Sequence, residues 1–144
     1  MRKLKPYKGA GIALFQNRED GVYVLLGLRA ITPKKGTWTF PGGGFEAIKG
    51  DVTLEDSAYR EFSEEVFSDI RKPTYKQHGK FSITVPFFKW LTLIVEDTGK
   101  SLAFANRLSH EFSKLEWVPV EKVKDLPLHP FVACVVRKYV RKKR

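Results

Sequence analysis

The chain has 144 residues, a length typical of one domain, and 42% of them are hydrophobic, which suits a packed core and excludes a disordered polymer. Its single cysteine, Cys134, can form neither an internal disulfide nor a zinc cluster, and no run of about 18 apolar residues would span a membrane, so we expect one cytoplasmic domain over 1–144. The formal net charge of +10 indicates either a well-solvated surface or an affinity for polyanions such as nucleotides and RNA.

The first predicted elements form a β-hairpin. Apolar runs at 10–15 and 22–28 flank the turn-rich segment 17–21, which is the pattern of two antiparallel strands and their connection. A short β-prone stretch at 37–40 follows, and we expect it to end at Pro41, which has no backbone N–H to donate.

Three consecutive glycines separate this stretch from the first predicted helix. They are Gly42, Gly43 and Gly44. Glycine lets the backbone turn sharply and approach other groups closely, so the segment is either an ordinary tight turn or a place of close approach, and we expect a loop after it as far as Asp51. From Thr53, a residue type that caps helices, apolar residues recur every four positions, which predicts an amphipathic helix over 53–68. The residues of its core stripe are Leu54, Ala58, Phe62 and Val66.

The second half of the chain predicts further strands and a second helix. In chain order these are strands at 81–85, 87–95 and 115–120, a helical turn at 123–126, and a helix that begins at Pro130 and continues over 131–140. Pro86, between the first two strands, indicates an edge strand or a bulge. Strands, helix, strands and helix in this order predict an α+β fold with helices packed on a mixed sheet.

The first predicted helix carries three carboxylates on one side. At about 100° per residue, Glu61, Glu64 and Glu65 fall within an arc of about 100°, where like charges repel one another. Arg60 can pair with Glu64 one turn later, but a single cation does not neutralise three acids. Mg²⁺ would, because it prefers carboxylate oxygens and bridges phosphates. The alternative is an acidic helix face that points to solvent.

Together with the upstream glycines, this helix resembles the Nudix box, whose pattern is G-x5-E-x7-R-E-U-x-E-E-x-G-U with U apolar. The similar residues are Trp38, Phe40, Pro41, Gly42, Gly43 and Glu46 before the helix, and Arg60, Glu61, Phe62, Glu64, Glu65 and Val66 within it. The predicted hairpin, which leads into Arg29, and the segment from Glu111 to Trp117 are also similar to parts of that family. The resemblance therefore covers most of the chain.

The chain departs from the box pattern at three points. Gly43 lies 17 residues before Arg60 where the pattern has 14, so the loop carries three extra residues. The loop glutamate of the pattern has no counterpart, and Asp51 is its nearest substitute. Phe67 stands where the pattern has a glycine after the paired acids.

The resemblance implies an α/β/α sandwich and a Mg²⁺-dependent hydrolase, with Mn²⁺ as a substitute metal, that cleaves a phosphoanhydride in a nucleoside diphosphate linked to another group. The implied metal ligands are Glu61, Glu64 and Glu65, one of which would double as general base, and the carbonyl of Gly42 or Gly43. Arg60 would orient a glutamate through an ion pair. Glu111 would be an additional ligand or the base, or else an ordinary surface acid.

Substrate recognition is less determined by the sequence. Arg29 is a candidate phosphate contact, Phe45 a candidate stacking partner and Asn106 a candidate hydrogen-bond partner for a base. Alternatively, Arg29 is a solvated cation, Phe45 is a core residue and Asn106 is a turn residue. The signatures of several subfamilies are absent, which leaves a MutT-like enzyme with nucleoside triphosphates as first candidates. The alternative is an RNA-directed protein, either a 5′-end pyrophosphohydrolase or a non-catalytic RNA-binding module, and a homodimer is open as well.

Overall fold

The computed structural model describes residues 6–30, 35–66, 74–98 and 112–143 of the chain. Its strands are β1 Tyr7–Arg18, β2 Gly21–Arg29, β3 Trp38–Thr39, β4 Gly42–Gly44, β5 Tyr75–Val85, β6 Phe88–Asp97 and β7 Phe112–Pro119. Its helices are α1 Leu54–Val66, α2 Val132–Lys143 and the 3₁₀ helices η1 Ala47–Lys49 and η2 Val120–Asp125. Among the described helices, none is long and apolar enough to cross a membrane.

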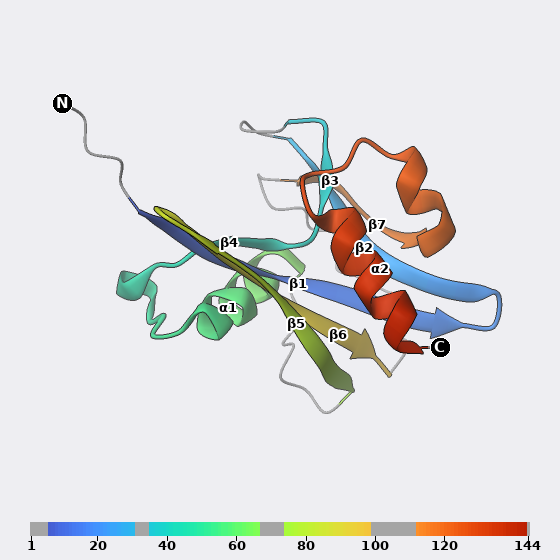
Figure 1. Ribbon diagram of the computed structural model, residues 1–144, viewed down its shortest axis with the longest axis horizontal. Helices are drawn as coiled ribbons and strands as arrows, with labels where there is room; N and C mark the ends of the chain where they lie inside the picture. The colour runs from blue at the N-terminus through green and yellow to red at the C-terminus, as the bar shows by residue number, and fades with distance from the viewer. Residues whose placement is uncertain (1–5, 31–34, 67–73, 99–111, 144) are drawn as a thin grey trace.

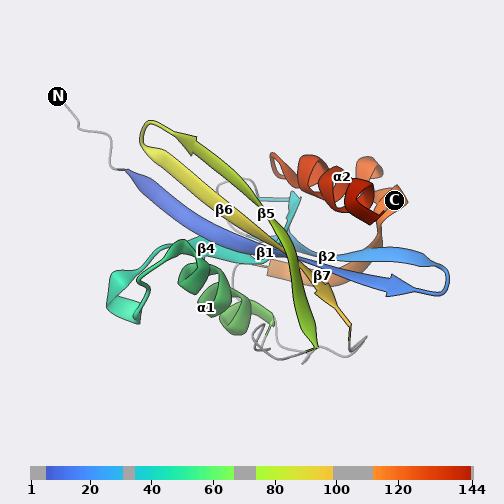
Figure 2. The same ribbon diagram turned by 60° about the horizontal axis from the view of Figure 1, so that its bottom comes forward.

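The sheet is built around β1 (Figure 1). The strand order is β3-β2-β1-β6-β5, with β4 paired to β1 and β7 paired to β2. β1 runs parallel to β6, and the other pairings of the sheet are antiparallel, so the sheet is mixed, as predicted. α1 and α2 lie on opposite faces of the sheet, which confirms the predicted α+β sandwich (Figure 2).

The predicted N-terminal hairpin is present, and its strands extend beyond their apolar runs. Arg18 pairs with Gly21 across a two-residue turn. β1 contributes side chains to both faces, because alternate residues of a strand point in opposite directions. Ile12 and Leu14 belong to the core beneath α1, whereas Ala13 and Phe15 belong to the core beneath α2.

The glycine-rich segment is a place of close approach, the second of the two sequence-based alternatives. Gly42–Gly44 is a strand, β4, which pairs antiparallel with Gly9, Ala10 and Gly11 of β1. The two backbones lie too close for side chains: a Cβ atom at Gly11 would lie 2.7 Å from the Pro41 carbonyl oxygen, and one at Gly42 would lie 2.6 Å from that of Ala10. Glycine is therefore required here for close approach as much as for turning.

The β5–β6 hairpin confirms the edge strand predicted from Pro86, and both of its strands are longer than predicted. Pro86 lies in the turn, and β5 forms an edge of the sheet. β5 starts at Tyr75, several residues before the predicted 81–85, because it pairs along the whole of β6 with a register shift between Gln77 and Gly79.

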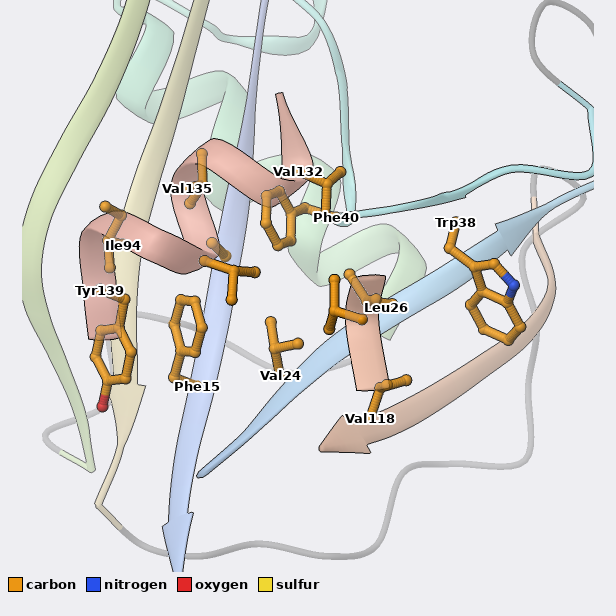
Figure 3. Packing of buried hydrophobic residues seen from close by; sticks show 13 residues of the cluster. Phe15, Val24, Leu26, Trp38, Phe40, Ile94, Val118, Val132, Val135 and Tyr139 are labelled. Carbon is orange, nitrogen blue, oxygen red and sulfur yellow. The ribbon is translucent and has the colours of Figure 1, made fainter. Parts of the chain in front are cut away.

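The core on the α2 side joins the second helix to the sheet (Figure 3). The rings of Phe15 and Tyr139 stack with their centroids 3.9 Å apart, and Val132 and Val135 cover the same side of the sheet. α2 begins at Val132, two residues after the predicted start at Pro130, because Phe131 has a φ of 76° in the left-handed region.

Candidate active site

A reciprocal cap fixes the start of α1. The Asp56 backbone N–H donates to Thr53 Oγ1 at 3.1 Å, and the N–H groups of Val52 and Thr53 each donate to Asp56 Oδ2 at 3.0 Å. This arrangement satisfies donors that a helix N-terminus leaves unpaired, so the predicted cap at Thr53 is confirmed. Ala58 and Phe62 are buried beneath the helix as predicted, while 67–68 of the predicted helix lie outside the described residues.

The predicted carboxylate Glu61 lies directly against β4. A Cβ atom at Gly43 would lie 2.5 Å from the Glu61 carboxyl carbon and from its Oε1, so only glycine leaves room for this side chain. Glu61 is 8% exposed, which is low for a residue that is charged at neutral pH. The glycine strand and the first acid of the helix are thus brought together as one unit.

Arg60 connects this unit to the rest of the helix and to the preceding loop. Its Nη1 donates to Glu61 Oε1 at 3.1 Å and to both Glu64 carboxylate oxygens at 3.4 Å. Its Nη2 donates to the Gly44 carbonyl oxygen at 2.9 Å. The guanidinium group therefore holds two of the three predicted acids around one point, beside the backbone of β4.

Asp51 is the residue whose importance the sequence understated. Arg60 donates to it from Nε, to Oδ1 at 3.0 Å and to Oδ2 at 3.3 Å, and from Nη2 to Oδ2 at 2.8 Å. The Ser57 hydroxyl and the Glu46 N–H each donate to Oδ2 at 2.9 Å. The Asp51 side chain is 2% exposed. The hydrogen bonds from Arg60 lower the pKa of Asp51 to about 2, helped by the Glu46 and Ser57 donors and opposed by burial. Asp51 also raises the pKa of Arg60, so the pair stays charged.

These contacts give Asp51 a positioning role. The sequence presented it only as the nearest substitute for the missing loop glutamate. The bidentate pair with Arg60 instead fixes the direction of the guanidinium group that faces Glu61 and Glu64. The three extra loop residues hid this pair in the sequence, because they remove Asp51 from the position that the box pattern leads one to inspect.

The same loop brings a second cation to the site. Lys49 Nζ lies 3.1 Å from Glu46 Oε2 and 3.8 Å from Glu64 Oε1, and Arg60 Nη1 lies 3.4 Å from Glu46 Oε2. The hydrogen bond with Glu46, followed by the charge of Glu64, raises the pKa of Lys49. Neither Lys49 nor Glu46 was predicted as part of an ion-pair network; the sign available in the sequence was a lone cation in the loop before the acidic helix.

The two predicted glycine ligands are not equivalent. The Ile12 N–H donates to the Pro41 carbonyl and the Phe45 N–H donates to the Lys8 carbonyl. Hydrogen bonds alternate along antiparallel strands, so the Gly43 carbonyl points toward β1 and the Gly42 carbonyl points away from it. A Cβ atom at Gly9 would indeed lie 2.6 Å from the Gly43 oxygen.

The remaining predicted residues are spread over the chain. Glu65 belongs to α1, but its side chain is outside the described part, and Glu111 and Asn106 lie outside the described residues altogether. Arg29 is the last residue of β2. Phe45 follows β4, and Lys8 Nζ lies 3.9 Å from the centroid of its ring. Among the described side chains, no three acids, histidines or cysteines are close enough together to form a ready-made metal site.

Comparisons with known proteins identify the family of the chain. The model of the NUDIX domain matches residues 5–139. A curated relative from Mycobacterium tuberculosis, named "Putative 8-oxo-dGTP diphosphatase 3", is 35% identical over 134 residues; the match covers 89% of this chain and only 59% of that protein. The chain therefore spans little more than half the length of this relative.

Solved structures show the same fold at low sequence identity. The Nudix hydrolase RenU of M. smegmatis has a TM-score of 0.75 at 22% identity, covering 99% of this chain and 89% of its own. The NUDIX domain of Shewanella oneidensis NrtR, in complex with ADP ribose, has a TM-score of 0.74 at 20% identity, and the match covers 99% of this chain and 91% of that domain's chain. A C. elegans Ap4A hydrolase has a TM-score of 0.73 at 18% identity, and the match covers 94% of this chain and 96% of the hydrolase chain. With its glycine strand, its acidic helix and a family match over nearly its whole length, the chain belongs to the Nudix family.

Proposed function

We propose that this protein is a Mg²⁺-dependent pyrophosphohydrolase that cleaves a phosphoanhydride bond of a nucleotide. One observation carries the proposal: the Glu61 carboxylate lies against Gly43, and Arg60 joins it to Glu64. A solvated acidic face would not need a glycine strand beneath it, nor a buried arginine between its acids. This arrangement is the one expected of carboxylates held for a cation.

The charges around Arg60 fit a divalent metal. Among the described side chains, four carboxylates contact two cations in this network, which leaves two negative charges. The carboxylates are Glu46, Asp51, Glu61 and Glu64, and the cations are Lys49 and Arg60. One Mg²⁺ ion, or one Mn²⁺ ion in its place, would balance that excess with the oxygen ligands it prefers.

We assign Glu61, Glu64 and Glu65, with the Gly42 carbonyl, as the residues that would hold the metal. Asp51 is excluded from this set, because Arg60, Ser57 and Glu46 already donate to its carboxylate. When bound, Mg²⁺ polarises a phosphoryl oxygen and lowers the pKa of a coordinated water. The protein's own part is to hold the acids in one direction through Arg60, and to supply a carboxylate that accepts a proton from the attacking water.

The substrate that we propose first is a nucleoside triphosphate. The M. tuberculosis relative is named for 8-oxo-dGTP, the C. elegans enzyme is named for Ap4A, and the NrtR domain is in complex with ADP ribose; all three ligands contain a nucleoside diphosphate linked to a further group. Arg29 as a phosphate contact, Phe45 and Asn106 as base contacts, and Glu111 as a base stay predictions. So do the 5′-end RNA activity, the homodimer and the cytoplasmic location.

A substrate panel with charge-neutral variants tests the proposal. We expect Mg²⁺-dependent release of pyrophosphate or phosphate from at least one nucleotide. Glu61→Gln and Glu64→Gln should each lower kcat by about 100-fold or more, since a lost metal contact costs several kcal/mol in the transition state. Glu55→Gln is the matched control, because Glu55 lies on the same helix but pairs with Lys80 at 3.5 Å. Full turnover by the Glu61 and Glu64 variants would refute the assignment.

A further inference from the structure

The outer surface of α2 carries a concentration of positive charge that the hydrolytic site does not use. A shallow open hollow on this helix is lined by Cys134, Arg137, Lys138, Arg141 and Lys142. α2 covers the face of the sheet opposite to α1, so this hollow and the acidic site are separated by the sheet and its two cores (Figure 2).

These four cations lie together without an ion-pair partner among the described residues. Arg137 and Arg141 are one helical turn apart, as are Lys138 and Lys142, and like charges at this spacing destabilise a helix. In the described part of the chain, no carboxylate lies within 4.0 Å of any of the four side-chain cations. Such a cluster is costly to the isolated protein, and an anionic partner would remove that cost.

Contacts with the edge strand hold part of the cluster in place. Lys138 Nζ donates to the Lys80 carbonyl and Lys142 Nζ donates to the His78 carbonyl, both in β5. A Cβ atom at Gly79 would lie 3.3 Å from Lys142 Nζ, so the lysine also lies close over the strand backbone. The two lysines therefore have backbone partners in β5, and all four cations are exposed. The cationic surface is in this respect preorganised.

An exposed aromatic residue lies just before the helix. Phe131 is 50% exposed, and its ring centroid lies 6.2 Å from that of Phe81 in β5. Phe131 precedes the first residue of α2, and its partner Phe81 follows Lys80, whose carbonyl accepts from Lys138, so the ring and the cations border the same stretch of β5. Nucleic-acid single strands are bound by this combination, a cationic groove that follows the phosphates and aromatic rings on which bases stack.

We propose that the hollow on α2, together with Phe131 just before the helix, binds single-stranded nucleic acid through its phosphates. A lipid surface fits less well, because Phe131 is a single exposed apolar side chain beside four cations, and the apolar face of α2 is buried against the sheet. Amphipathic helices that lie in membrane interfaces present a whole apolar face to the lipid next to their cations. The site is independent of the proposed hydrolysis, and its failure would leave that function untouched.

Fluorescence anisotropy with a labelled single-stranded RNA of about 20 nucleotides tests the proposal across a salt series. The double variant Arg137→Gln/Arg141→Gln should weaken binding at least about 10-fold at 0.05 M salt. It should also reduce the slope of log Kd against log salt by about 1.4, since each phosphate contact contributes about 0.7. The control is Lys122→Gln/Lys124→Gln, which removes the same charge from exposed positions in η2. Phe131→Ala should weaken binding to single strands more than binding to duplex RNA.

Each other outcome overturns the proposal. Absence of binding at 0.05 M salt would do so, as would equal losses in the α2 and η2 variants. Tighter binding to phosphatidylserine vesicles or to polyglutamate than to RNA would assign the surface to a membrane or to an acidic protein. Both double variants should keep wild-type nucleotide hydrolysis and the wild-type melting curve by circular dichroism, which shows that neither a folding defect nor the hydrolytic site is being measured.

Discussion

Replacing Asp51 by asparagine tests the charge network at its most buried point. The pKa of Asp51 falls from about 3.8 to about 2 in the folded chain, and each unit corresponds to about 1.4 kcal/mol. The ionised carboxylate therefore contributes about 2.5 kcal/mol to the free energy of unfolding at pH 7. Because the side chain is 2% exposed, solvent screening does not reduce this figure appreciably.

The loss of unfolding free energy caused by Asp51→Asn should be larger at neutral pH than at acidic pH. A depressed folded-state pKa stabilises the protein above the unfolded value of about 3.8, and that stabilisation is lost as the pH falls toward about 2. The difference between wild type and Asp51→Asn should thus be about 2.5 kcal/mol at pH 7 and about 1.3 kcal/mol at pH 3. Urea unfolding followed by circular dichroism at both pH values measures it.

The control for this experiment is Asp125→Asn, which neutralises an exposed acid at the end of η2. It should change the free energy of unfolding by less than about 0.5 kcal/mol at either pH. The reasoning fails if the Asp51→Asn difference is the same at pH 7 and pH 3, because the destabilisation would then not come from the ionised carboxylate. A loss no larger than that of the control would refute the buried ion pair itself.

Three further variants examine the site and the second core. Gly43→Ala should lower kcat and Mn²⁺ affinity by about 10- to 100-fold with little change in Tm, because its Cβ would displace the Glu61 carboxylate; calorimetric metal titration measures this. Lys49→Gln should lower the half-saturating Mg²⁺ concentration about 2- to 5-fold, because the lysine no longer competes with the metal for Glu64; an unchanged concentration would contradict this. Tyr139→Phe should cost about 1–2 kcal/mol in urea unfolding by removing the 2.6 Å bond to Glu96, and an unaltered midpoint would contradict it.

Local patterns in the sequence were enough for much of the fold. The change from alternating to four-residue periodicity at Thr53 located α1, and the turn-rich segment 17–21 located the first hairpin. These elements are predictable because their cap, turn and apolar stripe lie within a few residues of one another. The acids Glu61 and Glu64 follow from the same periodicity, since the side of the helix that carries them is fixed once the helix is known.

What the sequence did not predict depends on partners that are distant in the chain. β4 is a strand because Gly9 and Gly11 of β1 leave room for its backbone, and no property of a glycine triplet reveals that pairing. Asp51 and Arg60 are nine residues apart, across the end of a loop and the start of a helix, so no regular period relates them. Their contact exists only because the loop turns back onto the helix.

The proposed hydrolytic site and the hollow on α2 lie on opposite faces of the sheet (Figure 2) and carry opposite charge. The site on α1 keeps an excess of two negative charges among its described side chains, so alone it would repel a polyphosphate. A divalent cation reverses the sign locally, while the net charge of +10 attracts anions to the protein from a distance of about a Debye length, near 10 Å at 0.1 M salt. The basic surface of α2 is not needed for that local reversal, because the sheet and both cores separate it from the acids. A cluster that remains uncompensated at such a separation is better explained by a partner of its own than by the chemistry on α1.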